Sequence, residues 1–285
     1  MLHIDTVMGW KIEPVEQTIT DTDCLLYALS LGYGRDPLDR TELPFVYEQG
    51  LRVVPSIASV LARPPFWMRD PATGIDWVKI VHGEQIGHFH KPVPVGATVV
   101  GETRVTGIDD KGTGRGALVY TETQIWNKAT GDLVAVNARS TFCRGDGGCG
   151  SAGTVASQAP TQKDRAPDAA VTYETQPGQA LLYRLNGDRN PLHSDPDIAR
   201  KAGFERPILH GLCTWGIACR ALLALCCEND PARLKSLRAR FSAPVVPGDS
   251  IETRIWREGT GVAFESRVPG RDVTVLKGGY ADVAA

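Results

Sequence analysis

The segment YRLNGDRNPLHSDPDIARKAGFERPILHG, residues 183–211, contains an acid, a base and a candidate oxyanion donor within a short stretch. Asp188 and His193 are the candidate acid–base pair, and a helix would place positions five apart roughly 140° from each other, on different faces. The two residues therefore have to lie on a turn. Gly187 permits the positive φ of a sharp turn, and Pro191 holds the residue before it extended, so a loop can direct both side chains to one point.

Two further features of the segment fit a reactive site, although G-D-x-N-P is also ordinary turn chemistry. Asn190 places an amide between the acid and the base. Ser194 is positioned to cap a new helix, and an apolar run begins at Gly211, where unpaired backbone N–H groups can bind negative charge. The segment as a whole therefore predicts an active-site loop followed by an anion-binding helix start.

The whole segment resembles the signature Y-x-L-[ST]-G-D-x-N-P-L-H of the MaoC-like dehydratases and type 2, (R)-specific enoyl-CoA hydratases. The chain matches this pattern at every position except Asn186, which is a small polar replacement. The similarity continues through AGFERPILHGLCTWG and KSLRARFSAPVVPGD, and in the first half through YALSLGYG, LPFVYE and HGEQ. It covers most of the chain. It implies a hydro-lyase of fatty-acid or related acyl-CoA metabolism, such as β-oxidation, that interconverts trans-2-enoyl-CoA and (R)-3-hydroxyacyl-CoA.

A weak internal duplication divides the chain of 285 residues into two units. Residues 89–98, FHKPVPVGAT, align with residues 241–250, FSAPVVPGDS, and share Phe, Pro, Val and Gly at the same offsets. Residues 146–168 between the halves are rich in Gly, Ser, Ala and Pro and lack an apolar period, which is typical of a linker. We therefore expect one unit at 1–145 and a second at 169–285.

Each unit is expected to end in a β-meander, because segments with alternating Val, Thr, Tyr and Trp are separated by turns that contain Gly. The expected strands are 98–108, 116–126 and 132–143 in the first unit, and 249–257, 261–268 and 272–283 in the second.

An apolar stretch, HGLCTWGIACRALLALC, precedes the second meander and reads as a helix wrapped by a sheet. The first-unit counterpart, VVPSIASVL, is short and soon stopped by two prolines. The chain thus predicts an α+β double hot-dog, with two antiparallel sheets that each wrap a central helix and with the N-terminal helix shortened. The resemblance implies that the first unit binds the acyl chain in the space left by the short helix, and that the second unit is catalytic.

Hydration of an enoyl thioester requires a base for water, a proton at C2 and a stabilised thioester oxygen. His193, with an ordinary pKa of about 6.5, suits the base, and Asp188 suits the proton carrier if its surroundings keep it protonated. The backbone N–H of Gly211 suits the oxyanion donor, and Asn190 would orient water or its neighbours. Because both proton-transfer groups lie on one loop, addition should be syn.

Further substrate-binding residues follow only from the resemblance. It implies roles in the substrate tunnel or in acyl-CoA contacts for Tyr27, Glu48, His82, Gly83, Lys111 and Phe241. For Lys111 a physical reason also exists, since an ammonium on a flexible turn suits a phosphate, although a solvated lysine is an equal alternative.

Composition limits the partners and the compartment. A net charge of −2 gives no electrostatic reason to expect nucleic acid or an anionic membrane as a partner. The first residues lack the features of a signal peptide, and the last residues lack a peroxisomal address, so we expect a cytoplasmic protein. The seven cysteines lack C-x-x-C spacing, so we expect them to be buried thiols in a reducing compartment. A homodimer that acts on an acyl-CoA thioester is expected, without a cofactor beyond the CoA of the substrate.

No metal is expected, because His82, His88 and His90 lack a carboxylate or cysteine that would complete a ligand set. Two other functions remain possible from the sequence. A hot-dog thioesterase would direct water at the thioester carbon, but the D-x-N-P-x-H turn favours hydratase chemistry. A catalytically silent acyl-CoA-binding protein would be favoured if the acid or the base were missing, and both are present.

Overall fold

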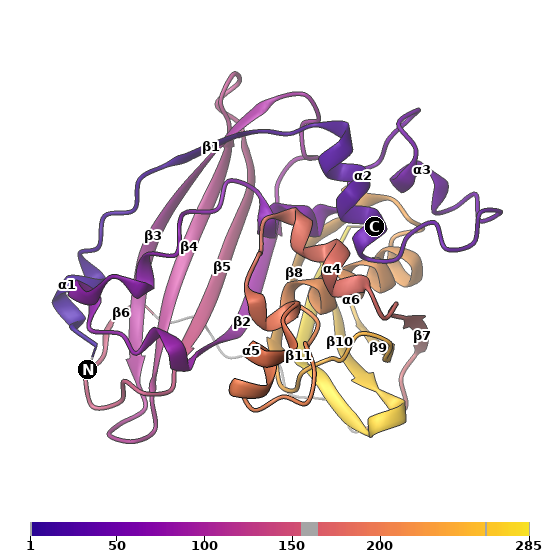
Figure 1. Cartoon of the computed structure of the whole chain (residues 1–285). Coiled ribbons are helices and arrows are strands. Elements are labelled where there is room, and N and C mark those ends of the chain that lie inside the picture. The colour runs from indigo at the N-terminus through magenta and orange to yellow at the C-terminus, as the bar shows by residue number, and fades with distance from the viewer. Residues whose placement is uncertain (1, 155–164, 260, 285) are drawn as a thin grey trace.

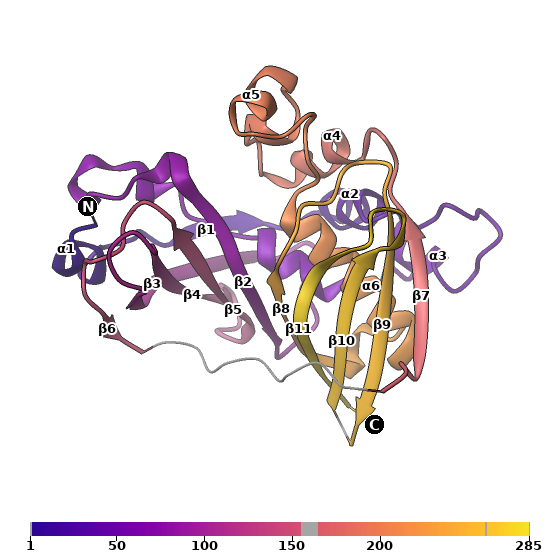
Figure 2. The ribbon, with the colours of Figure 1, turned by 90° about the horizontal axis from the view of Figure 1, so that it is seen from below.

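The computed structural model describes residues 2–154, 165–259 and 261–284, and their strands pair antiparallel into one sheet (Figures 1 and 2). The strand order is β1-β3-β4-β5-β2-β8-β11-β10-β9-β7, with β6 paired to β3 off this path. The strands are β1 (Val15–Thr18), β2 (Ile80–Phe89), β3 (Thr98–Asp110), β4 (Ala117–Asn127), β5 (Leu133–Cys143), β6 (Ala152–Gly153), β7 (Ala169–Glu174), β8 (Leu234–Phe241), β9 (Ser250–Glu258), β10 (Gly261–Val268) and β11 (Val273–Val283).

Both predicted meanders are confirmed, as β3-β4-β5 and as β9-β10-β11, with strand ends shifted by at most two residues. The sheets of the two units join edge to edge, because β2 pairs with β8 over five residue pairs from Glu84↔Arg240 to His88↔Ser236. The duplicated segments that begin at Phe89 and Phe241 follow directly from these two central strands. The double hot-dog of α+β class is therefore confirmed, with a single continuous sheet in place of two separate ones.

The central helix of the second unit is α6 (Gly211–Cys226), and it is buried along nearly its whole length. Its apolar residues on all sides, including Trp215 and Ile217, pack into the main hydrophobic core. The first-unit counterpart is η1 (Pro55–Val60), a short 3-10 helix that contacts β2, β5 and α6. The shortened first helix predicted from the sequence is thus confirmed.

The helix α2 (Asp21–Ser30) of the first unit lies beside α4 (Gln179–Tyr183) of the second unit (Figure 1). A capping box between Thr20 and Asp23 fixes its start. At its end, the Ser30 carbonyl accepts a hydrogen bond of 3.0 Å from Gln179 Nε2, and Ser30 Oγ accepts one of 3.0 Å from Asn186 Nδ2. Asn186, the departure from the family signature, thereby ties the second unit to the first.

A buried ion pair also joins the units. Arg220 of α6 donates from Nε to Glu42 Oε1 at 2.7 Å, and both side chains are at most 10% exposed. Glu42 directly precedes α3 (Leu43–Val46), and the guanidinium lies 3.8 Å from the centre of the Tyr173 ring on β7. The charge of Arg220 inside an otherwise apolar helix is therefore neutralised by the opposite unit.

Residues 146–154, the start of the expected linker, pack against the first unit. Asp146 is buried and accepts a hydrogen bond of 3.0 Å from the Asp76 amide, and Thr154 N donates to Thr106 O at 2.9 Å. Residues 155–164 of the expected linker lie outside the described residues. The short helix α1 (Ile4–Met8) lies at the outer end of the first unit, and the short helix α5 (Pro196–Lys201) projects from the second unit beyond α4 (Figure 2).

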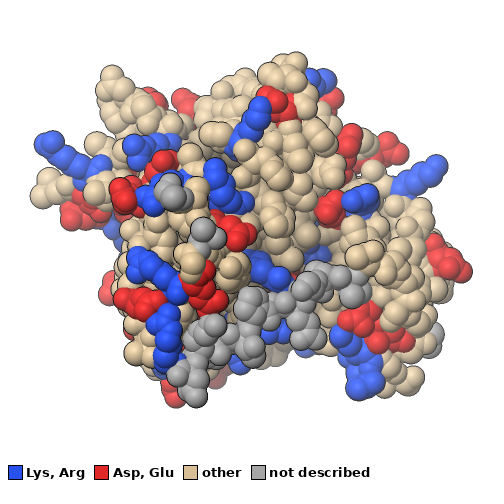
Figure 3. Space-filling view, turned by 180° about the vertical axis from the view of Figure 1, so that it is seen from behind, with Lys and Arg blue, Asp and Glu red and all other residues tan. Residues whose placement is uncertain are grey.

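The surface carries both signs of charge. On the face shown in Figure 3, acidic and basic side chains are interspersed and form no extended basic field. In the described part of the chain, no helix combines the length and the apolar character needed to cross a bilayer.

Candidate active site

The predicted turn is formed as expected between α4 and α5. Gly187 has φ +102°, which favours glycine, and Asn190 before Pro191 is extended with φ −54° and ψ 123°. Asn190 is exposed, and its side-chain oxygen accepts a hydrogen bond of 3.1 Å from Leu192 N, so it shapes the loop that carries His193. The expected cap at Ser194 is wrong. Asp195 caps α5 instead, because its carboxylate accepts hydrogen bonds from two backbone amides of the first turn.

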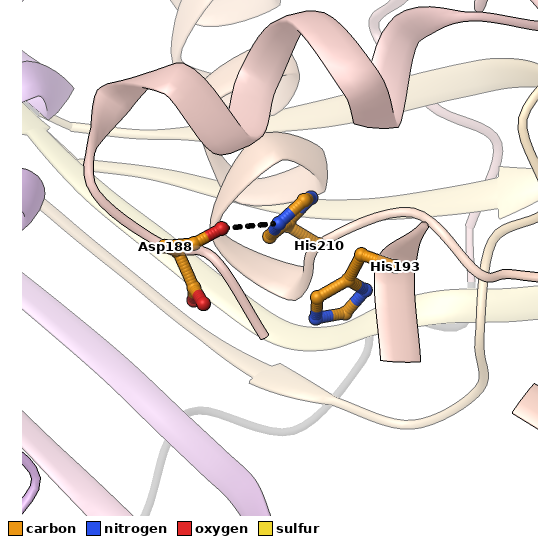
Figure 4. A group of neighbouring side chains, drawn as sticks. All are labelled: Asp188, His193 and His210. Atoms are coloured by element: carbon orange, nitrogen blue, oxygen red, sulfur yellow. Dashed lines mark hydrogen bonds between the residues drawn. The ribbon is translucent and has the colours of Figure 1, made fainter. Parts of the chain in front are cut away.

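Three side chains converge on this loop (Figure 4). One carboxylate oxygen of Asp188 and one ring nitrogen each of His193 and His210 all lie within 4.8 Å of one another. The imidazole rings of His193 and His210 stack with centres 3.7 Å apart. The structure therefore brings the predicted acid and base together, and it adds His210, which was not among the predicted site residues.

His210 is the residue directly before α6, and it is buried. The only signal for it in the sequence is its place before Gly211, in the second of two His-Gly dipeptides. Its Nε2 lies 3.1 Å from the Asp188 backbone oxygen, as the dashed line in Figure 4 shows. The centre of its ring lies 5.0 Å from the centre of the Tyr183 ring. His210 thus links the catalytic loop to the start of the central helix.

Backbone carbonyls fix the tautomers of both rings, because a carbonyl oxygen can only accept. His193 Nδ1 lies 2.9 Å from Ile208 O and must carry the hydrogen, which leaves Nε2 as a free proton acceptor. His210 Nε2 donates to Asp188 O, so its Nδ1 holds a lone pair and has no partner among the described residues. His193 is therefore prepared to act as a base.

The electrostatics of the cluster set its resting charge. Burial raises the pKa of Asp188, but Arg63, His210 and His193 outweigh burial and hold this pKa below its ordinary value. Burial lowers the pKa of His193, and burial together with His193 lowers the pKa of His210 to about 4. At neutral pH the free protein thus holds an ionised aspartate and two neutral histidines. The condition that its surroundings keep Asp188 protonated is not met, because Arg63 lies with Nη1 3.9 Å from Oδ2 and favours the carboxylate.

Gly211 opens α6 next to residues from both units. A Cβ at this position would lie 3.2 Å from the Phe241 ring, and that ring lies 4.7 Å from the ring of His82 on β2. Gly211 is the first residue of α6, so its N–H has no intrahelical acceptor, and it forms no hydrogen bond to another described residue. The expected oxyanion donor is therefore free, and Phe241 and His82 adjoin it.

His82 is held neutral. Its Nε2 lies 3.1 Å from Glu84 O and therefore donates, and burial, Arg139 and Arg63 lower its pKa to about 3. Gly83 follows at an irregularity of β2, where a Cβ would meet Ser140 Oγ at 2.7 Å. These two residues form part of the strand that borders the site.

The other residues implied by the resemblance lie elsewhere. Tyr27 is fully buried, donates to Ser56 Oγ at 2.9 Å and contacts the ring of Tyr183, so it supports the core behind His210. Glu48 is exposed beyond α3. Lys111 lies on the exposed β3–β4 turn and pairs with Asp109 at 2.5 Å. The structure does not bring Glu48 or Lys111 into the cluster of Asp188.

A carboxylate and two imidazoles are also a donor set that transition metals accept. Among the residues that the structure describes, Asp188, His193 and His210 are the group that converges in this way, and His82, His88 and His90 do not. Each of the two clustered rings already donates one N–H to a backbone carbonyl. The chemistry considered below uses the three side chains themselves.

The two halves of the chain match two family models. Residues 18–145 match the MFE-2 hydratase 2 N-terminal domain, and residues 158–277 match the MaoC like domain. The chain is 36% identical to the peroxisomal enoyl-CoA hydratase 2 of Arabidopsis thaliana, over 98% of this chain and 94% of that protein. It is 40% identical to 3-hydroxyacyl-thioester dehydratase Y of Mycobacterium tuberculosis, over 93% of this chain and 91% of that protein.

A solved structure agrees with these matches. The MaoC-like dehydratase from Phytophthora capsici superimposes with a TM-score of 0.86 at 33% identity, over 98% of each chain. The similarity therefore extends through both hot-dog units and includes the segment that carries Asp188, His193 and Gly211. The chain belongs to the MaoC-like family, in the group of two-unit enoyl-CoA hydratases 2.

Proposed function

We propose that this protein is a hydro-lyase that adds water to trans-2-enoyl-CoA and gives (R)-3-hydroxyacyl-CoA, and that it catalyses the reverse dehydration. The site geometry is the main support for this proposal. His193 Nε2 is a free proton acceptor beside the ionised Asp188, and the Gly211 N–H lacks an acceptor among the described residues. The relatives named enoyl-CoA hydratase 2 and 3-hydroxyacyl-thioester dehydratase support it.

The resting charges determine the path of the proton. His193 Nε2 removes a proton from water while the water oxygen forms a bond to C3. The resulting imidazolium is stabilised by the Asp188 carboxylate, which receives the proton and delivers it to C2. One O–H bond breaks, one C–O bond and one C–H bond form, and both side chains return to their starting charge. Asp188 is thus a proton carrier that begins the reaction ionised.

The electron pair of the double bond moves toward the thioester oxygen during the addition. The Gly211 N–H, at the start of α6, can donate to this oxygen as it gains charge. The absence of a side chain at Gly211 leaves space for the thioester between the helix start and the Phe241 ring. The helix start therefore stabilises the enolate-like oxygen, and Asn190 maintains the loop that holds the base.

The stereochemistry follows from the common origin of the two groups. Asp188 and His193 lie on one loop, so the hydroxyl and the proton reach the same face of the double bond. The addition is syn, and the relationship to the MFE-2 hydratase 2 domain supports the (R)-alcohol as the product.

A thioesterase is the alternative, and one experiment separates the two reactions. With trans-2-enoyl-CoA, the hydratase abolishes the enoyl-thioester absorbance and releases no thiol, whereas a thioesterase releases free CoA stoichiometrically. Both signals can be followed in one cuvette with a thiol reagent, and chiral analysis identifies the alcohol. Stoichiometric thiol would overturn the function, and an (S)-alcohol would overturn the one-loop geometry while leaving hydration intact.

We also propose the setting in which the reaction occurs. The first unit, 1–145, binds the acyl chain, and the second unit, 169–285, supplies the catalytic groups after a linker at 146–168. The protein acts as a homodimer in the cytoplasm, in fatty-acid or related acyl-CoA metabolism, and needs no cofactor beyond the CoA of its substrate. The Arabidopsis relative is named peroxisomal, so subcellular imaging of the tagged protein is the direct test of location.

A further inference from the structure

A band of polar side chains crosses the face of the first-unit sheet that η1 covers. The members are cross-strand neighbours: Arg139 on β5 lies opposite Gln85 on β2 and Thr121 on β4, and Asn137 lies opposite Thr123. Asn137 Nδ2 donates to Ala58 O of η1 at 2.7 Å, which places the band on the inner face. This is the face where the shortened helix was expected to leave space for an acyl chain.

The band borders a cavity of about 30 Å³ that begins next to the catalytic cluster. Leu212, the residue after the oxyanion donor, lines it together with Arg63, whose Nη1 lies 3.9 Å from Asp188 Oδ2, and with Asn137 and Arg139. If the thioester oxygen binds at Gly211, this cavity is a place for the acyl carbons beyond C3. A space of this size holds only one or two water molecules, so side chains of the cavity wall must move to admit even a short chain, and a long chain is disfavoured.

The charges of the band are incompletely paired. Arg139 Nε donates to Thr121 Oγ1 at 3.2 Å, and none of the carboxylates in the described part of the chain forms an ion pair with it. Burial and the nearby Arg63 lower the pKa of Arg139 to about 10, as expected for a guanidinium in an unfavourable site. Asn137 Oδ1 is also buried without a partner. Among the described residues, the cavity is thus lined by two guanidinium groups and by no carboxylate.

Other arginines near this sheet show the contrast. Arg104 pairs with Glu122 at 2.8 Å, and Arg238 pairs with Glu84 at 2.8 Å. A buried guanidinium without a counter-charge is costly unless an anion satisfies it, and a carboxylate can accept two parallel hydrogen bonds from it. The positive charge at Arg139 is therefore available to a ligand.

We propose that Arg139 binds an anionic oxygen at the far end of a short acyl chain, and that the substrates are trans-2-enoyl-CoA thioesters of dicarboxylic acids. This inference rests on the proposed hydratase function and specifies its substrate class. The phosphates of CoA share the same anionic chemistry. The position of the cavity, inside the first unit and beyond Leu212, assigns the anion to the acyl chain.

The test compares two six-carbon substrates, trans-2-hexenedioyl-CoA with a free terminal carboxylate and trans-2-hexenoyl-CoA without one. Wild-type kcat/KM should be higher for the carboxylated ester by about 10- to 100-fold, the range of a hydrogen-bonded charge. Arg139→Met should reduce this ratio to near one, and Arg139→Lys should restore part of it. Arg104→Met removes the same charge from the outer face of the sheet and should leave the ratio unchanged.

The same acyl groups as N-acetylcysteamine thioesters, which lack all phosphates, distinguish the two sources of anion. The Arg139-dependent preference should persist with these esters. If Arg139→Met instead weakens both CoA esters equally and neither N-acetylcysteamine ester, Arg139 contacts CoA and the inference is wrong. A wild type that prefers trans-2-hexenoyl-CoA would also overturn it.

Binding measurements separate this inference from the proposed function. Calorimetry with the saturated esters adipyl-CoA and hexanoyl-CoA requires no turnover, and adipyl-CoA should bind more tightly in an Arg139-dependent manner. If that preference holds while neither enoyl ester is hydrated, the hydratase function fails and the anion site stands. If both enoyl esters are hydrated without an Arg139-dependent preference, the function stands and the anion site fails.

Discussion

The two hot-dog units share a strand order but differ in what the sheet covers. In the second unit the sheet wraps α6, which fills the interior with apolar side chains along its whole length. In the first unit the corresponding element is η1, only six residues long, and polar side chains line the inner face beyond it. The difference separates two tasks, since the complete unit supplies a rigid helix start and a catalytic loop, and the incomplete unit supplies space and charge.

The comparison also shows that neither unit is sufficient. Asp188, His193 and His210 belong to the second unit, whereas Arg63, which sets the charge of Asp188, belongs to the first. If the tasks are divided in this way, substitutions in the two units should change different measured properties.

The largest effect should come from the second-unit loop. Asp188→Asn or His193→Ala should each lower kcat by about 10²- to 10⁴-fold, the scale of general acid–base catalysis, with folding unchanged. The loss of enoyl-thioester absorbance measures the rate, and circular dichroism checks the fold. Asp197→Asn is the matched control, because Asp197 is exposed on α5 and pairs only with Arg200. Turnover at the wild-type rate in either folded variant would remove that residue from the mechanism.

The next effect concerns the contact between the units. Glu42→Gln leaves the buried guanidinium of Arg220 uncompensated and should lower the free energy of unfolding by about 3–5 kcal/mol. Glu16→Gln breaks an exposed pair with Lys128 and should cost about 0–1 kcal/mol. Urea denaturation compares the two variants. Equal small losses would mean that the buried pair does not stabilise the interface.

A smaller effect is expected at the helix start. Gly211→Ala places a Cβ 3.2 Å from the Phe241 ring, which should narrow the thioester site and lower kcat/KM by about tenfold, or about 1.4 kcal/mol. Gly178→Ala is the control, because no atom lies within 4 Å of a Cβ there and φ is −92°. Steady-state kinetics with trans-2-hexenedioyl-CoA and trans-2-hexenoyl-CoA measure both variants. An unchanged Gly211→Ala enzyme would place the oxyanion donor elsewhere.

The smallest effect is a shift in pH dependence that connects the units. Hydration needs neutral His193 and ionised Asp188, and both pKa values lie below their ordinary values. Activity should therefore be present at neutral pH and be lost only as the pH falls below the ordinary pKa of histidine, about 6.5. Arg63→Met removes the largest influence that lowers the pKa of Asp188, so burial should raise this pKa until protonation of Asp188, in place of that of His193, limits activity. The acid limb of kcat/KM should then move to higher pH. Arg69→Met, at an exposed position, should not move it. An unmoved limb in Arg63→Met would separate the first unit from the catalytic charge.

Much of the fold was predictable because its signals are local. Residues that favour strands alternate between turns that contain glycine, and this pattern predicts the meanders. An apolar stretch between Gly211 and Cys226 predicts the buried helix. The edge-to-edge joining of the sheets was not predicted, because the β2–β8 pairing depends on a contact between residues about 150 positions apart, from Glu84 to Arg240.

The site was predictable where its residues share one loop. Asp188 and His193 were found together in the sequence, and the structure brings them together. Arg63 and Arg139 were missed because strand pairing and the packing of η1 bring them to the cavity from distant positions. The charge of Asp188 was left conditional for the same reason, since the local sequence indicates burial but not the distant arginine that opposes the effect of burial.

The ladder between β2 and β8 has a mechanical consequence. Five residue pairs of backbone hydrogen bonding make the two halves one rigid body, and such a seam cannot open as a hinge without breaking its hydrogen bonds. Entry of substrate and release of product must then proceed by side-chain and loop movements at the rim, on a faster timescale than domain closure. The enzyme should have the same overall dimensions in solution with and without bound ligand.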